Sequence, residues 1–281
     1  MIKQVLVSGS EGQLGKALQS LSKEYTQYSF DFFDRQKLDL ASESSIQSIL
    51  EKPYDFFINA AAYTAVDKAE SEIDKCYMVN TDALRLITKH AHPKTKIIHF
   101  STDYVYHNDE RVPMNETMPT FPKSVYGKSK LAGEEILIKE RPDSIVVRTS
   151  WVYSENGHNF VKTMLRLGKK LDHLKIVSDQ LGAPTYAMDL ADIALKLTDN
   201  YKAGIYNYAN GGQTNWADFA REIFRQSGIT CEVSNISTEE FGAAAPRPQW
   251  SVMSMEKISQ WLETDIPDWK NSLRKCLSRM D

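Results

Sequence analysis

The sequence predicts an α/β fold: a Rossmann-type doubly wound parallel sheet with a smaller C-terminal substrate-binding domain. Three observations predict it. Short apolar runs alternate with helix-like segments, a glycine-rich turn follows the first run, and a glycine or polar residue ends each run. Continuous apolar strands separated by helices are typical of a parallel sheet covered on both faces. Ligands bind beyond the carboxyl ends of such strands, so we expect a site at that edge.

The expected strands are the apolar runs at 5–8, 30–33, 56–58, 97–100 and 145–147, which end at Gly9, Asp34, Asn59, Ser101 and Arg148. Apolar residues at helical spacing predict helices at 14–21, from 126 through 135, at 159–170 and near 188–198.

After Trp151 the pattern loosens, and beyond the last of these helices we expect more irregular structure. We assign residues 1–150 to an NAD(P)-binding Rossmann domain. Residues 151–281 form mainly a substrate-binding region, with segments that return to the first domain's sheet.

The composition excludes several classes of partner. The 281 residues carry a formal net charge of −3, which gives no long-range attraction for nucleic acid or an anionic membrane. A local cationic pocket for a phosphorylated substrate stays open. The cysteines, Cys76, Cys231 and Cys276, are widely spaced and odd in number, as expected for reduced thiols. No apolar stretch approaches the roughly 20 residues of a membrane span, and we expect a cytoplasmic protein.

The glycine-rich turn has the spacing G-x-x-G-x-x-G, formed by Gly9, Gly12 and Gly15. It follows a predicted strand and opens a predicted helix. Glycines there let the backbone approach a pyrophosphate, which the helix N-terminus stabilises. The spacing is one residue longer than in the common dinucleotide fingerprint, so the context of strand, turn and helix favours cofactor binding over a structural turn.

Asp34 and Arg35 follow the second predicted strand, about 20 residues after the glycines. An acid at this place can bind the hydroxyls of the adenosine ribose, whereas an arginine can receive a 2′-phosphate. With both present, NADH and NADPH stay open as the cofactor. Arg35 is equally well explained as an exposed loop residue.

Tyr126 and Lys130 are the candidate catalytic pair. Their four-residue separation on a helix places both side chains on one face, whereas Lys128 points elsewhere. A nearby ammonium favours the phenolate and would lower the tyrosine pKa toward neutrality. Thr102, at the end of a strand, could bind the carbonyl oxygen that Tyr126 protonates. These groups beside a dinucleotide turn indicate hydride transfer.

We expect no metal site. His90 and His92 lie two residues apart at a helix end before a proline, without an evident third ligand.

Six stretches carry a resemblance to a known family. They read GSEGQLG at 9–15, NAAAYTAVDKAE at 59–70, STDYVY at 101–106, YGKSKLAGE at 126–134, RTSWVY at 148–153 and DQLGAPT at 179–185. With these motifs the chain resembles the extended short-chain dehydrogenases/reductases, and within them the dTDP-4-dehydrorhamnose reductase family. The motifs run through about two thirds of the chain in the family's order.

The resemblance implies a reaction and a set of roles. The reaction is NADPH- or NADH-dependent reduction of the C4 ketone of a dTDP-sugar, dTDP-4-dehydro-β-L-rhamnose. Tyr126 would donate the proton, with Lys130 tuning it and binding the nicotinamide ribose. The implied cofactor residues are Gly9, Gly12, Gln13, Leu14 and Gly15 at the pyrophosphate, Asp34, Arg35, Asp39 and Leu40 at the adenosine, and Ala61, Ala62, Tyr63 and Thr64 at the middle. The implied substrate residues are Thr102, Asp103, Trp151 and Arg247.

Departures from the family pattern limit which residue roles the resemblance implies for this chain. Related dehydratases resemble Thr-Asp-Glu where this chain has Tyr104 as the third residue, which argues against elimination of water. Near the C-terminus Met253 replaces a leucine, and Arg247 is nearly as well explained as a surface residue. Some relatives carry acidic residues at the helix start that resemble a magnesium-dependent dimer contact. This chain has Lys16 there, so the resemblance implies no metal.

Two alternatives stay open at this point. One is a ketoreductase for another nucleotide-deoxysugar, and the other is a catalytically silent regulatory subunit on the same fold. The oligomeric state is also open, with a homodimer as one option.

Overall fold

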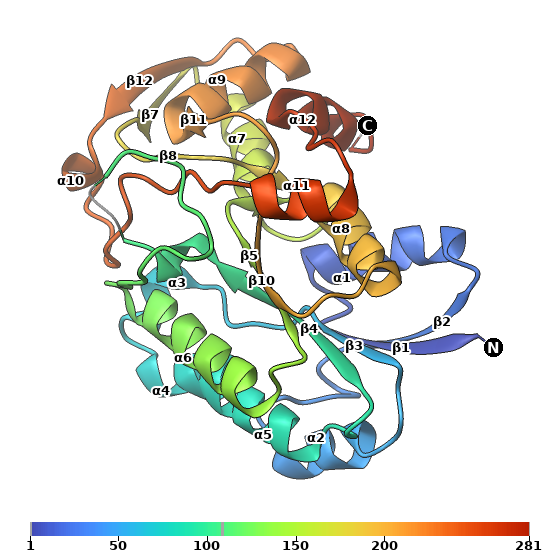
Figure 1. Ribbon diagram of the computed structural model, residues 1–281. Helices are drawn as coiled ribbons and strands as arrows, with labels where there is room; N and C mark the ends of the chain where they lie inside the picture. Colours follow the sequence, from blue (N-terminus) through green and yellow to red (C-terminus); the bar gives the residue numbers. More distant parts are fainter. Residues whose placement is uncertain (1, 108–109, 281) are drawn as a thin grey trace.

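The computed structural model describes residues 2–107 and 110–280. Over these residues six strands form one parallel sheet in the order β2-β1-β3-β4-β5-β10 (Figure 1). They are β1 (Lys3–Ser8), β2 (Tyr28–Phe33), β3 (Phe56–Asn59), β4 (Lys96–Thr102), β5 (Ile145–Thr149) and β10 (Gly204–Tyr208). The predicted α/β class with a Rossmann-type parallel sheet is confirmed.

Each face of the sheet has its own apolar core. On one face Leu6 and Phe57 pack with α2 (Glu43–Leu50), α5 (Ala83–His90) and α6 (Val125–Glu140). On the other face Val5 and Val7 pack with α1 (Gln13–Leu21) and α8 (Ala187–Asp199). This alternation along β1 follows from the two-residue period of a strand, and it explains the continuous apolar runs in the sequence.

Short helical segments connect the first five strands. They are the 3₁₀ turns η1 (Ser22–Glu24) and η3 (Asp103–Val105), the helices α3 (Val66–Ala69) and α4 (Ile73–Tyr77), and the π-helical turn η2 (Met78–Asp82). In Figure 1 α4, α5 and α6 lie together along one side of the sheet, and α1 and α8 lie along the other.

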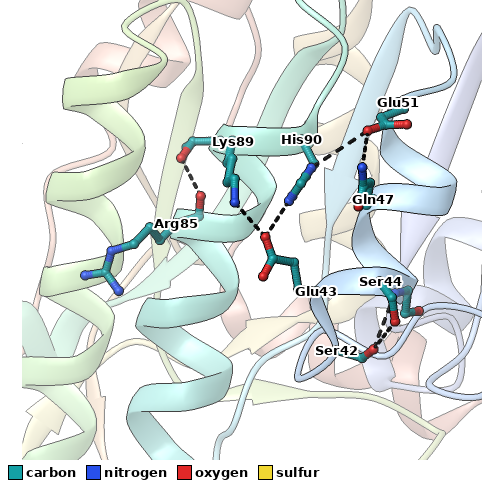
Figure 2. A network of polar contacts seen from close by, with 10 residues as sticks. Ser42, Glu43, Ser44, Gln47, Glu51, Arg85, Lys89 and His90 are labelled. Atoms are coloured by element: carbon teal, nitrogen blue, oxygen red, sulfur yellow. Dashed lines mark hydrogen bonds and ion pairs between the residues drawn. The ribbon is translucent and has the colours of Figure 1, made fainter.

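A polar network holds α2 against α5, as Figure 2 shows. Glu43 Oε1 accepts a hydrogen bond from Lys89 Nζ at 2.7 Å and contacts His90 Nε2 at 2.9 Å. The other ring nitrogen of His90 lies 4.0 Å from Glu51 Oε1. His90 therefore joins two helices. In the described ranges, no group of three or more His, Cys, Asp or Glu side chains could hold a metal ion.

The chain after β5 is more regular than its sequence pattern predicted. Its elements are β6 (Val152–Tyr153), α7 (Phe160–Gly168), β7 (His173–Val177), β8 (Leu181–Gly182), β9 (Thr185–Tyr186), β11 (Thr214–Asn215), α9 (Trp216–Ser227), β12 (Glu232–Ile236), α10 (Thr238–Phe241), α11 (Glu256–Leu262) and α12 (Trp269–Leu277), besides α8 and β10.

The expectation of irregular structure near the C-terminus was wrong. The helix α9 has a clear start signal, because the Asn215 side chain accepts a hydrogen bond from Asp218 N at 2.8 Å. Its buried residues Phe219 and Ile223 are four positions apart, which is helical spacing. Within this half, β10 leaves its sequence neighbours and pairs with β5. Across the described residues, no helix is both long and apolar enough to cross a membrane.

An ion pair that is almost fully buried joins the sheet to α6. Arg148 on β5 donates to both carboxylate oxygens of Glu134, with the shortest contact, from Nη2 to Oε2, at 2.6 Å. Arg148 also donates to Tyr106 Oη at 2.7 Å, and that hydroxyl donates to Asn207 on β10 at 3.0 Å. These partners explain why β5 continues past the apolar run, which we expected to end at Arg148.

We expect Arg148→Met to lower the free energy of unfolding by about 3–5 kcal/mol, because it leaves the Glu134 carboxylate buried without its counter-charge. Chemical denaturation followed by circular dichroism measures this. The matched control is Arg85→Met, since Arg85 also contacts a carboxylate, that of Asp82, at 2.6 Å but on the exposed surface. It should cost no more than about 1 kcal/mol. Equal losses in the two variants would contradict the assignment.

Candidate active site

The glycine-rich turn lies between β1 and α1 and leaves no room for a side chain at Gly9 or Gly15. Gly9 adopts a φ of 69°, a left-handed conformation that favours glycine. A Cβ placed on Gly15 would lie 2.3 Å from the carbonyl oxygen of Gly9. Gly12 is the N-cap of α1, so the first N–H groups of that helix have no partner within it. This geometry suits a pyrophosphate at the start of α1.

The loop after β3 touches this turn. A Cβ on Gly9 would meet the backbone nitrogen of Ala61 at 2.8 Å, so the two loops are in direct contact. Tyr63 N donates to the side chain of Asn80 at 2.9 Å, which holds the loop that also contains Ala62 and Thr64. In the sheet β1 lies between β2 and β3, and connections diverge there. Dinucleotides bind at such a switch point.

The residues after β2 form a polar turn. Asp34 Oδ1 accepts hydrogen bonds from the backbone N–H groups of Gln36 and Lys37, both at 3.0 Å. The side chain of Arg35 is 78% exposed, and its Nε lies 3.6 Å from Asp39 Oδ1. Leu40 is buried beneath this turn. The arginine can therefore reach a ligand above the turn without breaking a buried contact.

Thr102, Asp103 and Tyr126 come together where β4 ends and α6 begins. Thr102 Oγ1 donates to Asp103 Oδ1 at 3.0 Å and accepts from Tyr104 N at 3.2 Å. Burial raises the pKa of Tyr126 above its ordinary value, and a hydrogen bond with the Thr102 side chain opposes that rise. The expected lowering of this pKa toward neutrality by Lys130 was therefore wrong. The phenol is thus protonated near neutral pH, the form that a proton donor needs.

The carboxyl group of Asp103 is buried and only partly bonded. Its Oδ2 has no hydrogen-bond partner among the described residues. Burial raises the pKa of Asp103 to about 7, opposed by the side chains of Thr102 and Ser251. An unpaired buried carboxyl oxygen costs stability unless a ligand or a proton satisfies it.

Lys130 is buried one turn along α6 from Tyr126, as the four-residue spacing predicts, but its contacts differ from our expectation. Its Nζ donates to Phe100 O at 2.6 Å and lies 3.0 Å from His99 Nε2. Over the described residues, no hydrogen bond joins Lys130 to the phenol of Tyr126. His99 was not predicted as a site residue, although it lies within β4, whose carboxyl end carries the predicted Thr102.

Trp151 adopts a φ of 47°, which is unusual for a residue with a side chain. Its ring stacks on Trp216, with centroids 3.6 Å apart, and packs over Gly182. Strained backbone of this kind persists where the surroundings fix it, and it occurs often in ligand sites. Trp216 therefore supports the ring of Trp151.

Arg247 lies over the same end of the sheet. It donates to Tyr104 Oη at 2.8 Å and to Asp67 Oδ2 at 2.6 Å. The backbone of Ala245 also donates to Asp67, at 3.1 Å. These bonds fasten the C-terminal segment to α3 and place it beside Thr102 and Asp103. The role of Arg247 at the substrate stays a prediction, and its partners Asp67 and Tyr104 were not predicted from the sequence.

Comparisons with known proteins show the family of the chain. The chain matches the RmlD substrate binding domain family over residues 3–281. It is 38% identical to the spore coat polysaccharide biosynthesis protein SpsK of Bacillus subtilis, covering 97% of this chain and 96% of that one. It is 37% identical to dTDP-4-dehydrorhamnose reductase of Salmonella typhimurium, covering 98% and 97%. The crystal structure of dTDP-4-dehydrorhamnose reductase from Bacillus anthracis in complex with NADP superposes with a TM-score of 0.95, at 36% identity and 99% and 100% coverage.

We expect the stability of the protein to fall as the pH rises toward 7 because of Asp103. The folded-state pKa of Asp103, about 7, lies above the unfolded value of about 3.9. The stabilisation of the folded state by the protonated carboxyl is therefore complete below pH ~4 and is lost as the pH rises through 7. The free energy of unfolding should fall by at most about 1.4 kcal/mol per pH unit. In Asp103→Asn this dependence should disappear, as measured by urea unfolding between pH 5 and 8.

The control for that measurement is Asp74→Asn, which removes an exposed carboxylate on α4. Its stability should follow that of the unaltered protein across the pH range. If Asp103→Asn kept the full slope, the buried carboxyl would not be its source.

Proposed function

The chain belongs to the RmlD substrate binding domain family, and on this basis we propose that it acts as a dTDP-4-dehydrorhamnose reductase. The reaction is the NAD(P)H-dependent reduction of the C4 ketone of dTDP-4-dehydro-β-L-rhamnose to dTDP-β-L-rhamnose. The observation that carries the proposal is the pair of Thr102 and Tyr126 beside a dinucleotide turn, in a chain similar to reductases of this name over nearly its whole length.

The cofactor half of the site is assigned to three loops. Gly9, Gly12, Gln13, Leu14 and Gly15 hold the pyrophosphate, Asp34, Arg35, Asp39 and Leu40 the adenosine, and Ala61, Ala62, Tyr63 and Thr64 the middle of the molecule. The bound dinucleotide supplies the hydride that reduces the ketone carbon. The side chain of Arg35 is exposed and is assigned to a 2′-phosphate, and the Bacillus anthracis relative was solved with NADP.

Tyr126 provides the proton side of the reaction. Its phenol gives a proton to the ketone oxygen, and the Thr102 hydroxyl fixes that oxygen by a hydrogen bond, for which its proton must turn away from Asp103 Oδ1. Burial keeps the phenol protonated before the step. Lys130 is assigned to the nicotinamide ribose and to Tyr126, for which its side chain must leave the hydrogen bonds to His99 and Phe100.

The sugar nucleotide lies between the strand ends and the C-terminal half. Asp103 offers its unpaired oxygen to a sugar hydroxyl, Trp151 covers the sugar, and Arg247 faces the diphosphate. Residues 1–150 are the cofactor domain and 151–281 mainly the substrate region, with β10 and α8 completing the first domain. We assign the protein to the cytoplasm, with a dTDP-sugar as its small-molecule partner.

The proposal predicts oxidation of NADPH or NADH, followed at the nicotinamide absorbance band, when dTDP-4-dehydro-L-rhamnose is generated in situ by the upstream enzymes. Tyr126→Phe should keep cofactor binding but lose at least about 100-fold in kcat, because the ring stays and the transferable proton goes. The control is Tyr54→Phe, at a tyrosine that donates to Asp31 on the exposed surface.

Two outcomes would overturn the assignment. Near-normal turnover in Tyr126→Phe would remove the tyrosine from its role. Absence of turnover by the unaltered protein, with cofactor still bound, would direct the search to another deoxysugar ketone, and then to a silent regulatory subunit.

Arg35→Ala should raise KM for NADPH about tenfold or more while changing KM for NADH little, because a charged hydrogen bond to the 2′-phosphate is lost. Steady-state kinetics with each cofactor measures the change in KM for NADPH and for NADH separately. Lys37→Ala is the matched control, since Lys37 is exposed on the same turn. An equal rise for both cofactors would place Arg35 outside the phosphate contact.

A further inference from the structure

A chain of buried polar side chains runs across the sheet to Lys130. Ser8, Asn59 and His99 are register partners on the neighbouring strands β1, β3 and β4. All three point to the face that α6 covers, because they continue the alternation of Leu6, Phe57 and Ile97. Together with Lys130 they are no more than 1% exposed. Such a network within the core of a sheet is costly unless every member is satisfied.

The contacts along this chain are short. Ser8 Oγ donates to Asn59 Oδ1 at 2.7 Å, and Asn59 Nδ2 lies 3.1 Å from His99 Nδ1. His99 Nε2 lies 3.0 Å from Lys130 Nζ, which also donates to Phe100 O. Four side chains are therefore linked end to end, from the first strand to the proposed active site.

One backbone group sets the direction of the hydrogen bonds. Ala61 N–H donates to Asn59 Oδ1 at 3.3 Å, and a backbone N–H can only donate. The amide nitrogen of Asn59 must then face His99 and donate to Nδ1. A neutral imidazole that accepts at Nδ1 carries its proton on Nε2, the nitrogen that faces Lys130.

This direction distinguishes the two charge states of Lys130. An uncharged amine accepts the proton of His99 Nε2 in a hydrogen bond and still donates to Phe100 O. An ammonium has no lone pair, so it would place N–H against N–H at this distance. For His99 Nε2 to accept a hydrogen bond from the ammonium, the imidazole proton would have to move to Nδ1. The Asn59 amide would then have to turn, and the hydrogen bond from Ala61 N–H would be lost.

We propose that His99 is a positioning residue for Lys130 in the cofactor-free protein, and that the Ser8–Asn59–His99 chain there stabilises the uncharged amine of Lys130 relative to its ammonium. The inference rests on the proposed function, in which Lys130 assists Tyr126. It adds that the proton of Lys130 is governed by a histidine in the sheet, and not only by the groups on α6.

The neighbouring charges agree with this assignment. Burial lowers the pKa of Lys130 to about 8, although Glu134 on α6 and Cys76 on α4 act to raise it. The charge of Glu134 is itself compensated by Arg148 on β5. Burial, and then the charge of Lys130, lowers the pKa of His99 well below its ordinary value, so the imidazole is neutral.

The direct test is ¹⁵N NMR of the histidine ring in cofactor-free protein, combined with a ¹⁵Nζ titration of the lysines. Lys130→Arg assigns the lysine signal. We expect His99 to carry its proton on Nε2 and Lys130 to titrate well below the usual lysine range. Observation of the Nδ1–H tautomer in the unaltered protein at the pH where Lys130 is uncharged would overturn the proposal.

Asn59→Asp should reverse the direction of the hydrogen bonds at His99 while it hardly changes the shape of the side chain. A carboxylate only accepts, so His99 moves its proton to Nδ1 and offers Nε2 to the ammonium. We expect the Nδ1–H tautomer and an upward shift of at least about one pH unit in the Lys130 titration. A Lys130 shift without a tautomer change would mean that charge alone acts, which contradicts the proposed direction.

Ser8→Ala is the matched control, because Ala61 still fixes the Asn59 amide when the serine hydroxyl is gone. Its tautomer and its Lys130 titration should match those of the unaltered protein, and a changed tautomer would contradict the role of Ala61. These measurements need neither cofactor nor sugar. They therefore remain decisive if the reductase assay fails, and a working reductase with the Nδ1–H tautomer would overturn this inference alone.

Discussion

The contact between the Gly9 turn and the loop after Asn59 is the constraint on which the site depends. The two loops leave the sheet from adjacent strands and touch at backbone distance, which is achieved only without a side chain at Gly9. The same loop contributes the Ala61 N–H that orients Asn59. Cofactor turn, sheet network and Lys130 are thus tied to one point of close backbone approach.

Much of the fold could be predicted because its signals are local. An apolar run that ends at Gly9 or Asn59 identifies a buried strand, and the spacing of Tyr126 and Lys130 identifies one helix face. The partners of these residues could not be predicted in the same way. Lys130 bonds to His99 because strand register and helix packing bring them together, and no sequence spacing encodes that meeting.

In the C-terminal half, local signals were missed and the site depends on long-range contacts. The cap at Asn215 and the spacing of Phe219 and Ile223 were readable signals that the sequence analysis overlooked. By contrast, the bond from Arg247 to Asp67 joins residues 180 positions apart. The support of Trp151 by Trp216 is of the same long-range kind. Substrate-side geometry therefore follows from the assembled fold, whereas the cofactor side follows largely from short motifs.

The late arrival of β10 has a consequence for folding. Its partner β5 ends at Thr149, but the strand that covers the open edge of β5 begins only at Gly204. During synthesis the first five strands can pair while that edge is unprotected, and an exposed edge is a template for intermolecular pairing. The segment between them must therefore emerge from the ribosome before β10 can pair with β5, and during this interval the nascent chain is open to aggregation through that edge.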